Sequence, residues 1–364
     1  MSDVPKIALF LMFLKSLHLT NFRNYSQLNL DFDNRTTVLL GNNAAGKSNV
    51  LEAIYFLSTT KSTRVEIEYE LIREAEPFSR VEASLEDREN DKTELVIVLN
   101  RQQKGQEEFK KKVLVNGIPR RVVDFVGNLP AVIFYPSDIE MVTGSPSLRR
   151  WHLDVSLAQV DSEYKRALSL YEQFLTARNR VLKKIREGEG KADELAYWTQ
   201  GLLTNAYLIQ SKRQDFFEFV RSLEDPLGDF GFKYQKSEIS SEKLAGSQSR
   251  EIAAAATLIG PHRDDYSMEL NGRHLSHFGS RGEQRTATLA FKLAQLEFMA
   301  GKLGKRPVLL LDDVFSELDA AHRAYVVSIV SRQQTIISTV ELENIPQEFL
   351  DSARILKVDN GQII

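Results

Sequence analysis

Eight consecutive residues, Gly41–Ser48, limit the possible folds of this chain more than any other feature of its sequence. They read GNNAAGKS and match the pattern G-x-x-x-x-G-K-[ST] at every fixed position. An apolar run typical of a β-strand, 36–40, precedes them, and apolar residues at helical spacing follow over 50–57. A glycine-rich turn between a strand and a helix N-terminus directs backbone N–H groups at a phosphate chain. The sequence therefore predicts a P-loop in an α/β fold.

The residues of a P-loop have separate tasks in nucleotide binding. We expect Lys47 to place its ammonium group against the β- and γ-phosphates of ATP, and Ser48 to bind Mg²⁺. Arg23 and Asn24, in the turn of the first predicted hairpin, are expected to reach the same nucleotide, although exposed turn residues without a ligand explain them equally well. The expected ATP-binding residues are Gly41, Asn42, Asn43, Ala44, Ala45, Gly46, Lys47, Ser48, Asn49, Arg23 and Asn24.

Two adjacent acidic residues, Asp312 and Asp313, end the apolar run PVLLLDD that begins at Pro307. A carboxylate at the end of a buried strand costs free energy unless it is paired or near a metal. In P-loop enzymes this is the place of the Walker-B aspartate. We therefore expect Asp312 to hold Mg²⁺ together with Ser48, and Asp313 to polarise the attacking water, so that Lys47, Asp312 and Asp313 form the catalytic set. An ordinary strand-end turn with two exposed aspartates is the alternative.

The residues Ser280–Gln284, which we call the signature segment, lie at the start of a predicted helix over 282–303. With the next residue they read SRGEQR, which resembles the LSGGQ signature of ABC-type ATPases, and they stand roughly 25–30 residues before the Asp pair, as in that fold. A Ser hydroxyl and exposed amides at a helix N-terminus can bind phosphate, although a simple N-cap has the same residues. Ser316 and Asp319 match the D-loop of this class. The expected signature residues are Ser280, Arg281, Gly282, Glu283 and Gln284.

Six motifs are spread over nearly the whole chain from Met12. They are LTNFRNY (19–25), GNNAAGKSN (41–49), FYPSDIEMVTGSPSLRRWHLD (134–154), GPHRDD (260–265), SRGEQR (280–285) and LLLDDVFSELD (309–319). Together they resemble the RecF family of bacterial recombination mediators, which belongs to the ABC-type ATPases with SMC- or Rad50-like heads. The segment KSTRV, Lys61–Val65, departs from the family pattern, in which a His follows the Ser.

The resemblance implies an α/β fold, namely an ABC-type P-loop ATPase head with a mostly helical inserted second lobe. We expect the head to comprise 12–140 and 255–364, the second part carrying the signature segment, the Asp pair and the D-loop, and the helical lobe to comprise 141–254. Residues 1–11 are expected to be a leader or a misassigned start, because the chain from Met12 reads as a first strand. Three independent domains are the alternative for this length.

Local patterns predict the individual elements. Two Asn-Gly pairs, at 116–117 and 271–272, indicate hairpin turns, and 148–222 has helical spacing. We expect Arg149, Arg150 and Asp154 to form an ion-pair network, and His262–Asp265 to form a structural network at a strand end. Asp138 is expected near the Q-loop position. The predicted strands are 13–19, 28–32, 36–40, 81–85, 95–99, 112–115, around 258, 266–270, 308–311, 335–338 and 355–358.

The family resemblance implies a function. It implies an ATP-dependent DNA-binding protein of recombinational repair, replication-fork maintenance and the SOS response, with a weak DNA-stimulated ATPase acting as a switch. Its cofactors would be ATP and Mg²⁺. Two heads would form a homodimer around two ATP molecules, each site using the P-loop of one chain and Ser280 and Gly282 of the other. Its partners would be gapped or duplex DNA, including single/double-strand junctions, and RecR- and RecO-type mediators that help load recombinase.

The net charge of −3 excludes a uniformly basic coat, but it leaves room for a local basic patch. The stretch 101–121 carries seven basic and two acidic residues, a local net of +5. We expect this predicted hairpin to contact DNA phosphates without reading sequence, although a solvated charged face is the usual explanation of such runs. The expected DNA-contacting residues are Lys110, Lys111, Lys112, Arg120 and Arg121.

The chain has no cysteine, which excludes disulfides, Cys-ligated metal sites and Cys nucleophiles, and fits a reducing cytosol. The most apolar run, 7–14, is too short to span a bilayer, so we expect a cytoplasmic protein without a membrane partner. A soluble ATPase subunit of an ABC transporter is the main alternative, but a switch His is expected where Ser338 and Thr339 stand. An SMC- or Rad50-like structural protein would need long heptad repeats, and a metabolic P-loop kinase does not explain the signature segment.

Overall fold

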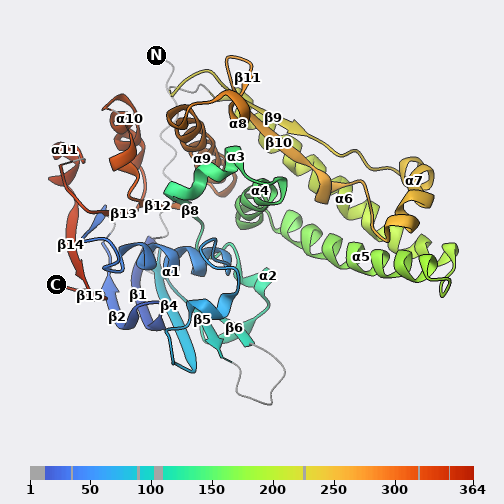
Figure 1. Ribbon diagram of the computed structural model, residues 1–364. Coiled ribbons are helices and arrows are strands. Elements are labelled where there is room, and N and C mark those ends of the chain that lie inside the picture. The colour runs from blue at the N-terminus through green and yellow to red at the C-terminus, as the bar shows by residue number, and fades with distance from the viewer. Residues whose placement is uncertain are drawn as a thin grey trace. The chain divides into compact units, whose positions relative to one another are not determined.

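The computed structural model describes residues 13–33, 36–87, 91–101, 110–223, 227–318, 320–343 and 345–364. Figure 1 shows the chain and labels its elements. The chain divides into two compact units, of which the first comprises Met1–Asp138 with Gln295–Ile364 and the second comprises Ile139–Ala294. Residues 1–11, expected to be a leader or a misassigned start, lie outside the described residues.

A mostly parallel six-stranded sheet in the first unit carries the P-loop. Its strand order is β15-β14-β3-β13-β12-β8, and only the β14–β15 pair is antiparallel. Every residue of β12 and β13 is buried, which explains the continuous apolar run VLLL of β12. The strands are β3 (Thr37–Leu40), β8 (Ala131–Phe134), β12 (Val308–Asp312), β13 (Thr335–Thr339), β14 (Arg354–Asp359) and β15 (Gln362–Ile363).

A second, antiparallel sheet in the same unit has the order β2-β1-β4-β5-β6-β7. Buried and exposed residues alternate along β4, as expected for a strand with one face on the core. Leu17 pairs with Leu30 and Leu19 with Val81, so apolar side chains share one face. The strands are β1 (Phe13–Phe22), β2 (Tyr25–Asp31), β4 (Phe78–Glu86), β5 (Lys92–Asn100), β6 (Lys110–Val115) and β7 (Ile118–Arg120).

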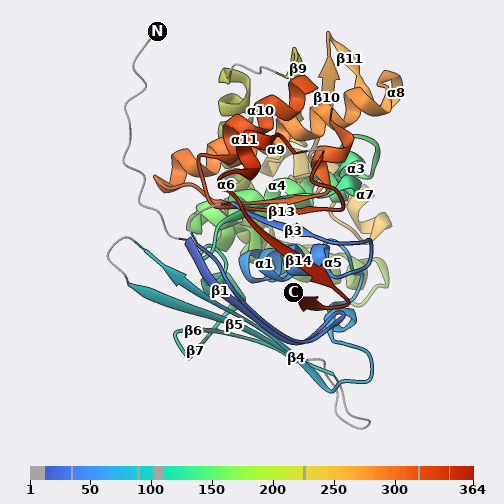
Figure 2. The ribbon, with the colours of Figure 1, turned by 90° about the vertical axis from the view of Figure 1, so that its left-hand side faces the viewer.

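Helix α1 (Lys47–Thr59) lies between these two sheets, as Figure 2 shows. It contacts β8, β12 and β13 of one sheet and β1, β4 and β5 of the other. All of its residues except Ser48 and Asn49 are buried, because a helix covered on both sides is apolar nearly all round. The helix that follows the P-loop is therefore held firmly. The shorter elements of the unit are η1 (Glu68–Leu71), α2 (Val122–Phe125), η2 (Pro136–Ile139), η5 (Val314–Glu317), α10 (Ala320–Val330) and α11 (Gln347–Leu350).

The second unit is mainly helical. Its longest helices, α5 (Ser162–Arg186) and α6 (Leu195–Ser222), pack side by side in Figure 1. The side chain of Asp161 caps α5 by accepting hydrogen bonds from the backbone of Glu163 and Tyr164. Helix α9 (Arg281–Leu303) begins in this unit and ends in the first. The other elements are α3 (Glu140–Thr143), α4 (Pro146–Val160), η3 (Ala192–Glu194), β9 (Phe230–Gln235), α7 (Ser241–Ala254), η4 (Pro261–Arg263), β10 (Asp265–Leu270), β11 (Arg273–His274) and α8 (Leu275–Phe278).

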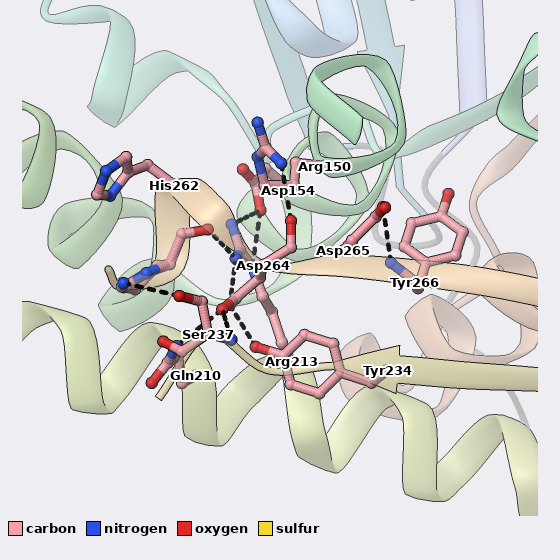
Figure 3. A network of polar contacts seen from close by, with 12 residues as sticks. Arg150, Asp154, Gln210, Arg213, Tyr234, Ser237, His262, Asp264, Asp265 and Tyr266 are labelled. Carbon is pink, nitrogen blue, oxygen red and sulfur yellow. Dashed lines mark hydrogen bonds and ion pairs between the residues drawn. The ribbon is translucent and has the colours of Figure 1, made fainter. Parts of the chain in front are cut away.

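A polar network joins the helices of the second unit to β9 and β10 (Figure 3). The buried guanidinium of Arg213 donates to Asp264 Oδ2 at 2.7 Å and to Asp154 Oδ1 at 2.8 Å. Asp264 also accepts hydrogen bonds from Gln210, at 2.8 Å, and from the hydroxyl of Tyr234, at 2.5 Å. A buried ion pair needs such full hydrogen bonding to offset its desolvation.

Of the expected ion-pair network, Arg149 and Asp154 each form an ion pair, with Asp265 and Arg213, whereas Arg150 donates to a backbone carbonyl. Arg149 binds Asp265 with two hydrogen bonds, of 2.7 and 2.8 Å, and Arg150 donates to the carbonyl of Asp264 at 2.7 Å. His262 donates from Nε2 to the carbonyl of Thr257. The GPHRDD motif therefore serves the packing of the second unit.

Two expectations about 226–260 are wrong. No strand forms around Leu258, because its backbone N–H bonds the carboxylate of Glu251 instead of a neighbouring strand. The strand β9 and the helix α7 were not predicted, although the alternating aromatic residues of β9, FGFKYQ, are typical of a strand. The sequence of α7 is mostly polar and small, and the side chain of Ser240 caps this helix. The compact second unit includes β9, β10, β11 and the start of α9, whereas the expected helical lobe ended at residue 254. The domain limits expected from the sequence stay a prediction.

Candidate nucleotide-binding site

The turn Gly41–Gly46 connects β3 to α1 and needs its glycines for steric reasons. A Cβ atom on Gly41 would stand 2.2 Å from the carbonyl oxygen of Val358. Gly46 has φ = 117°, in the left-handed region that side chains disfavour, and a Cβ there would meet the side chains of Asn24 and Tyr25 at 2.7 Å. These glycines therefore let the turn pack closely against β14 and the first hairpin, which fixes the shape of the P-loop.

Residues of the first hairpin hold the P-loop from outside. Asn24 donates from Nδ2 to the carbonyl of Ala45 at 3.2 Å, and the hydroxyl of Tyr25 donates to the carbonyl of Gly46 at 3.1 Å. Asn49, at the start of α1, donates to Oδ1 of Asn24 at 2.8 Å. Asn24 was expected to reach the nucleotide, and the structure places it against the loop backbone, where it supports the shape of the turn.

The ammonium group of Lys47 lies inside the turn of the P-loop. It donates to the carbonyl oxygens of Gly41, at 2.7 Å, and Asn42, at 2.8 Å. Burial lowers the pKa of Lys47, while the nearby carboxylates of Asp312 and Asp313 oppose that shift. The lysine therefore stands where the phosphates of a bound nucleotide would meet its charge.

Three side-chain oxygens meet where the carboxyl ends of β12 and β13 face the N-terminus of α1. Ser48 donates to Asp312 Oδ1 at 2.7 Å, and Ser338 donates to the same oxygen at 2.5 Å. Within the described residues no group of three or more His, Asp or Glu side chains could hold a metal ion by itself. Mg²⁺ bound with a nucleotide commonly takes only one or two protein oxygens and shares the phosphates. The donor set of Ser48 and Asp312 fits Mg²⁺.

Asp313 occupies an unusual backbone conformation directly after Asp312. Its φ of 52° is left-handed, and its N–H bonds the carbonyl of Ser338 at 3.1 Å. Burial and the neighbouring charge of Asp312 raise the pKa of Asp313, although a hydrogen bond from Ser316 opposes the rise. Ser316 also donates to the carbonyl of Asp313 at 2.7 Å, which ties the D-loop to the Asp pair. The other D-loop residue, Asp319, lies outside the described residues.

The sequence analysis missed a buried acid on α1, Glu52, which is only 1% exposed. Arg23 binds both of its oxygens, at 2.9 and 2.7 Å, so Arg23 is held by a carboxylate and does not stand free. Ser62 and Arg64 also donate to Glu52, at 2.5 and 3.3 Å. The segment Lys61–Val65, which departs from the family pattern, is thus anchored to the P-loop helix. The sequence feature that could have identified Glu52 is its charge, which stands inside the apolar run of the helix.

The signature segment lies at the start of α9, in the second unit. The backbone N–H of Ser280 donates to the carboxylate of Glu283 at 2.7 Å, and the backbone N–H of Glu283 donates to the hydroxyl of Ser280 at 3.3 Å. This is a capping box, and Ser280, Arg281, Gly282 and Glu283 all keep solvent-accessible surface. Gln284 differs, because it is buried and donates to the carbonyl of Leu275 at 2.8 Å. The signature segment thus caps α9 and at the same time exposes Ser280–Glu283 to solvent.

The remaining predicted residues are dispersed. Asp138 is buried and accepts a hydrogen bond from the backbone of Tyr135 at 2.8 Å. Ser338 bonds Asp312, while the hydroxyl of Thr339 donates to the carbonyl of Glu341 at 2.8 Å. Ser338 is therefore the residue at the expected switch position that contacts the catalytic set.

The expected DNA-contacting residues do not share one face. Lys111 pairs with the buried Leu99 across the sheet, and its ammonium binds Glu68, at 2.7 Å, and the carbonyl of Thr60, at 2.9 Å. The role of Lys111 as a DNA contact stays a prediction, and its ammonium is already engaged within the chain. Lys112 faces the opposite side and is exposed. Arg120 and Arg121 are exposed, and Arg121 forms an ion pair with Asp124. Lys110 is the first residue of β6.

The fold and this site define an ATP-hydrolysing head domain of the ABC type, with the two-sheet arrangement of SMC-like heads. Residues 13–362 match the family model described as RecF/RecN/SMC N terminal domain. Proteins named DNA replication and repair protein RecF are 39% identical in Herpetosiphon aurantiacus and 37% identical in Geobacillus kaustophilus, over 97% of this chain and 99% of each relative. The chain belongs to the RecF family.

Solved structures agree with this assignment. The recombination mediator protein RecF with ATP, described as part of the RecFOR pathway, superposes with a TM-score of 0.87 at 29% identity, over 99% of both chains. An SMC head domain from Pyrococcus yayanosii matches with a TM-score of 0.53 at 14% identity over 97% of both chains, which concerns the fold alone. The alternative of an ABC transporter subunit is not favoured. Among the described residues, no helix is long and apolar enough to cross a bilayer.

Proposed function

We propose that this chain is an ATP-dependent DNA-binding protein of recombinational repair and replication-fork maintenance, whose weak DNA-stimulated ATPase acts as a switch. The observation that carries the proposal is the meeting of Lys47, Ser48 and Asp312 at one end of the parallel sheet. The names of the relatives, which concern DNA replication and repair, support the biological setting.

The residues of the site divide the work. Lys47 binds the β- and γ-phosphates of ATP, and Ser48 and Asp312 hold Mg²⁺. When bound, Mg²⁺ neutralises negative charge on the phosphates. Asp313 accepts a proton from the attacking water, for which its raised pKa makes it a better base than an ordinary aspartate.

The signature segment acts on a second copy. Ser280 and Gly282 are accessible at the start of α9, and a Cβ on Gly282 would meet nothing within 4 Å, so a phosphate can approach its backbone. Two copies thus sandwich two ATP molecules, and the homodimer forms on gapped or duplex DNA in the cytoplasm. RecR- and RecO-type mediators are the protein partners, as the RecFOR setting of the solved relative suggests.

DNA binds through its phosphates to the basic edge, which we define as Lys110, Lys112, Arg120 and Arg121. Lys112 and Arg120 are exposed. Lys111 is left out of the edge, because its side chain is only 17% exposed and its ammonium is bound to both Glu68 and the carbonyl of Thr60. Arg121 stays in the edge, because its side chain is 79% exposed in its ion pair with Asp124. Because phosphate contacts carry no sequence information, binding is independent of sequence and sensitive to salt.

Sedimentation velocity tests the proposal. The wild-type chain is run alone, with ATP and Mg²⁺, with a short duplex, and with both. We expect a dimer only with ATP, and a larger ATP-dependent complex when duplex is present. ATP hydrolysis should rise with duplex. Asp312→Asn should prevent the ATP effects, whereas Asp351→Asn, which changes an exposed acid of the same unit, should leave them unchanged. Identical sedimentation with and without ATP would contradict the switch, and an ATPase indifferent to DNA would favour the transporter class.

A further inference from the structure

A hollow of about 290 Å³ opens beside the signature segment. It lies between the end of β10, the following turn, α8 and the first turn of α9. Glu283 belongs both to the signature segment and to the lining of this hollow. Whatever closes on the signature segment therefore also faces the hollow. The lining residues are Leu270, Asn271, Arg273, Leu275, Phe278, Gly279 and Glu283.

The ring of Phe278 is 75% exposed, more than any other large apolar side chain among the described residues. The other apolar residue of α8 that lines the hollow, Leu275, is 2% exposed, so the short helix packs on one side and presents Phe278 on another. The ring of Phe278 makes an edge contact with the ring of His277, at 6.3 Å between centroids. An exposed aromatic ring beside a hollow offers a flat surface on which another ring can stack.

The rim of the hollow carries a guanidinium, that of Arg273, and a carboxylate, that of Glu283. Arg273 is exposed, and its charge, after the hydrogen bonds from Ser280, helps to lower the pKa of Glu283. Arg273 and Glu283 line the same hollow, so the guanidinium lies beside the first turn of α9, where the carboxylate of Glu283 accepts a hydrogen bond from the backbone N–H of Ser280. An aromatic plane, a guanidinium and helix N-terminal amides are the groups that recognise a nucleotide: a base by stacking and its phosphates by charge.

We propose that Phe278 and this hollow take the base of the nucleotide held by the P-loop of a second copy. The proposal rests on the proposed function, in which Ser280 closes over the partner's nucleotide. Phe278 is two residues from Ser280, so their Cα atoms are at most about 7 Å apart. A side chain so close to the phosphate contact can reach further along the same nucleotide. The base then becomes part of the dimer contact, and a purine, which offers the larger stacking surface, promotes dimerisation better than a pyrimidine.

Three substitutions at one position test the proposal by sedimentation equilibrium with ATP. Phe278→Ala removes the ring, Phe278→Leu keeps an apolar side chain without a ring, and Phe278→Tyr keeps the ring. Removing one base–aromatic stack weakens an equilibrium about 5- to 150-fold, and a homodimer of the variant loses both of its stacks, so dimerisation should weaken by about 25- to 20,000-fold. We expect weakening in this range for the Ala and Leu variants and near wild-type dimerisation for the Tyr variant. Tyr197→Ala, which removes an exposed ring on α6 of the same unit, is the matched control and should have no effect.

A comparison of ATP with UTP identifies the ligand. The wild-type chain should dimerise more readily with ATP, and this preference should shrink towards 1 in Phe278→Ala. Binding of a fluorescent ATP analogue to the monomer is measured in a Ser280→Arg background, with and without the further change Phe278→Ala. The two affinities should be equal, because the monomer holds ATP with its own P-loop.

Each contrary outcome has one meaning. Full dimerisation by Phe278→Leu would show that an apolar side chain suffices without a ring. The occupant of the hollow would then be an apolar protein surface and not the base, which would overturn the proposal. Full dimerisation by Phe278→Ala, while Ser280→Arg abolishes it, would overturn this inference and leave the proposed function standing. Full dimerisation by Ser280→Arg would overturn the shared site itself, and with it the role of Phe278.

Discussion

The hydroxyl of Ser48 donates a 2.7 Å hydrogen bond to Oδ1 of Asp312, although the two residues are 264 positions apart in the chain. Ser338 reaches the same oxygen because β13 lies beside β12, with Ser338 paired to Asp312 in register. The P-loop, the Asp pair and the end of β13 therefore meet at the carboxyl ends of parallel strands, where α/β sheets bind their ligands.

Lys47→Ala should abolish tight nucleotide binding. Lys47 is the one formal charge that the P-loop places on the phosphates, and a hydrogen bond to a charged group contributes about 1.5–3 kcal/mol. The dissociation constant should therefore rise by about 10- to 150-fold. Titration with a fluorescent ATP analogue measures this, with Lys61→Ala, an exposed lysine outside the loop, as the control. Equal affinity in Lys47→Ala and wild type would contradict the assignment.

Asp313→Asn should bind ATP but hydrolyse it about 10²- to 10⁴-fold more slowly, because an amide cannot accept the proton of the attacking water. Asn also tolerates the left-handed backbone of Asp313, so the fold should be unchanged. The variant should accumulate as an ATP-bound dimer. Single-turnover hydrolysis and sedimentation measure the two effects. Hydrolysis at the wild-type rate would remove Asp313 from the role of base and leave Asp312 as the essential carboxylate.

The basic edge should control the salt dependence of DNA binding. The double variant Lys112→Ala/Arg120→Ala should weaken binding to all duplex sequences alike, and it should reduce the slope of log K against log salt by up to about 2, at about 0.9 for each lost phosphate contact. Fluorescence anisotropy over a salt series gives the slope. Lys111→Ala is the matched control, because the Lys111 ammonium is bound to Glu68. A slope unchanged in the double variant would identify this edge as a merely solvated face.

The second unit should lose stability as the pH falls below about 6.5. Burial lowers the pKa of His262, and it lowers the pKa of His152 well below the ordinary value. Below pH 6.5 the unfolded chain binds protons that the folded chain does not, so unfolding becomes more favourable, by at most about 1.4 kcal/mol per pH unit for each histidine. After burial, the groups that influence the pKa of His262 most are Thr257, Arg263, Arg150 and Asp264. The ring Nδ1 of His262 is hydrogen-bonded to the hydroxyl of Tyr171.

Thermal unfolding at pH 8, 7, 6 and 5.5 tests this dependence. The midpoint should be level between pH 8 and 7 and should fall from pH 6.5 downwards. His262→Gln removes one titrating ring and should show a shallower fall, even if its stability at pH 8 is lower. His277→Gln, which changes an exposed histidine of the same unit, should follow the wild type. An equally steep fall in His262→Gln would show that other groups cause it.

Local patterns predicted the parts of the fold that depend on neighbouring residues. Both Asn-Gly pairs form hairpin turns, and at each pair the two residues have positive φ, as type I′ turns need. The P-loop and the buried strand before the Asp pair are likewise short-range signals. Their meeting at one site followed from the pairing of a P-loop with a Walker-B aspartate in P-loop enzymes, because the spacing of 264 residues between Ser48 and Asp312 carries no local signal.

The residues that the sequence analysis missed depend on long-range contacts. Glu52 finds its partners in Arg23 and in the loop after α1, and nothing near Glu52 in the sequence indicates either contact. Lys111 could have been treated differently, since neighbouring residues of a strand face opposite sides and three successive lysines cannot share one face. Gln284 was assigned with its accessible neighbours, although the helical period turns it towards Leu275.

Complementation between two inactive variants tests whether the active site is shared. In Ser280→Arg, the long cationic side chain blocks the facing γ-phosphate, while the P-loop of that chain remains intact. In Lys47→Ala, the P-loop is lost and the signature segment remains normal. A mixture contains heterodimers in which the intact P-loop of the first chain faces the intact signature segment of the second. We expect the mixture to recover part of the ATPase activity that each variant lacks alone.

The size of the recovery reports how the two sites depend on one another. If one site built from the P-loop of one chain and the signature segment of the other is enough for hydrolysis, the activity should follow the fraction of heterodimers as the mixing ratio changes, with a maximum near equal amounts. If hydrolysis requires both sites, the mixture should still form ATP-dependent dimers more readily than either variant, as sedimentation would show. Wild-type dimerisation or full ATPase activity by Ser280→Arg alone would refute the assignment in trans, because the accessible capping box of Ser280 and Glu283 would then be only the N-cap of α9.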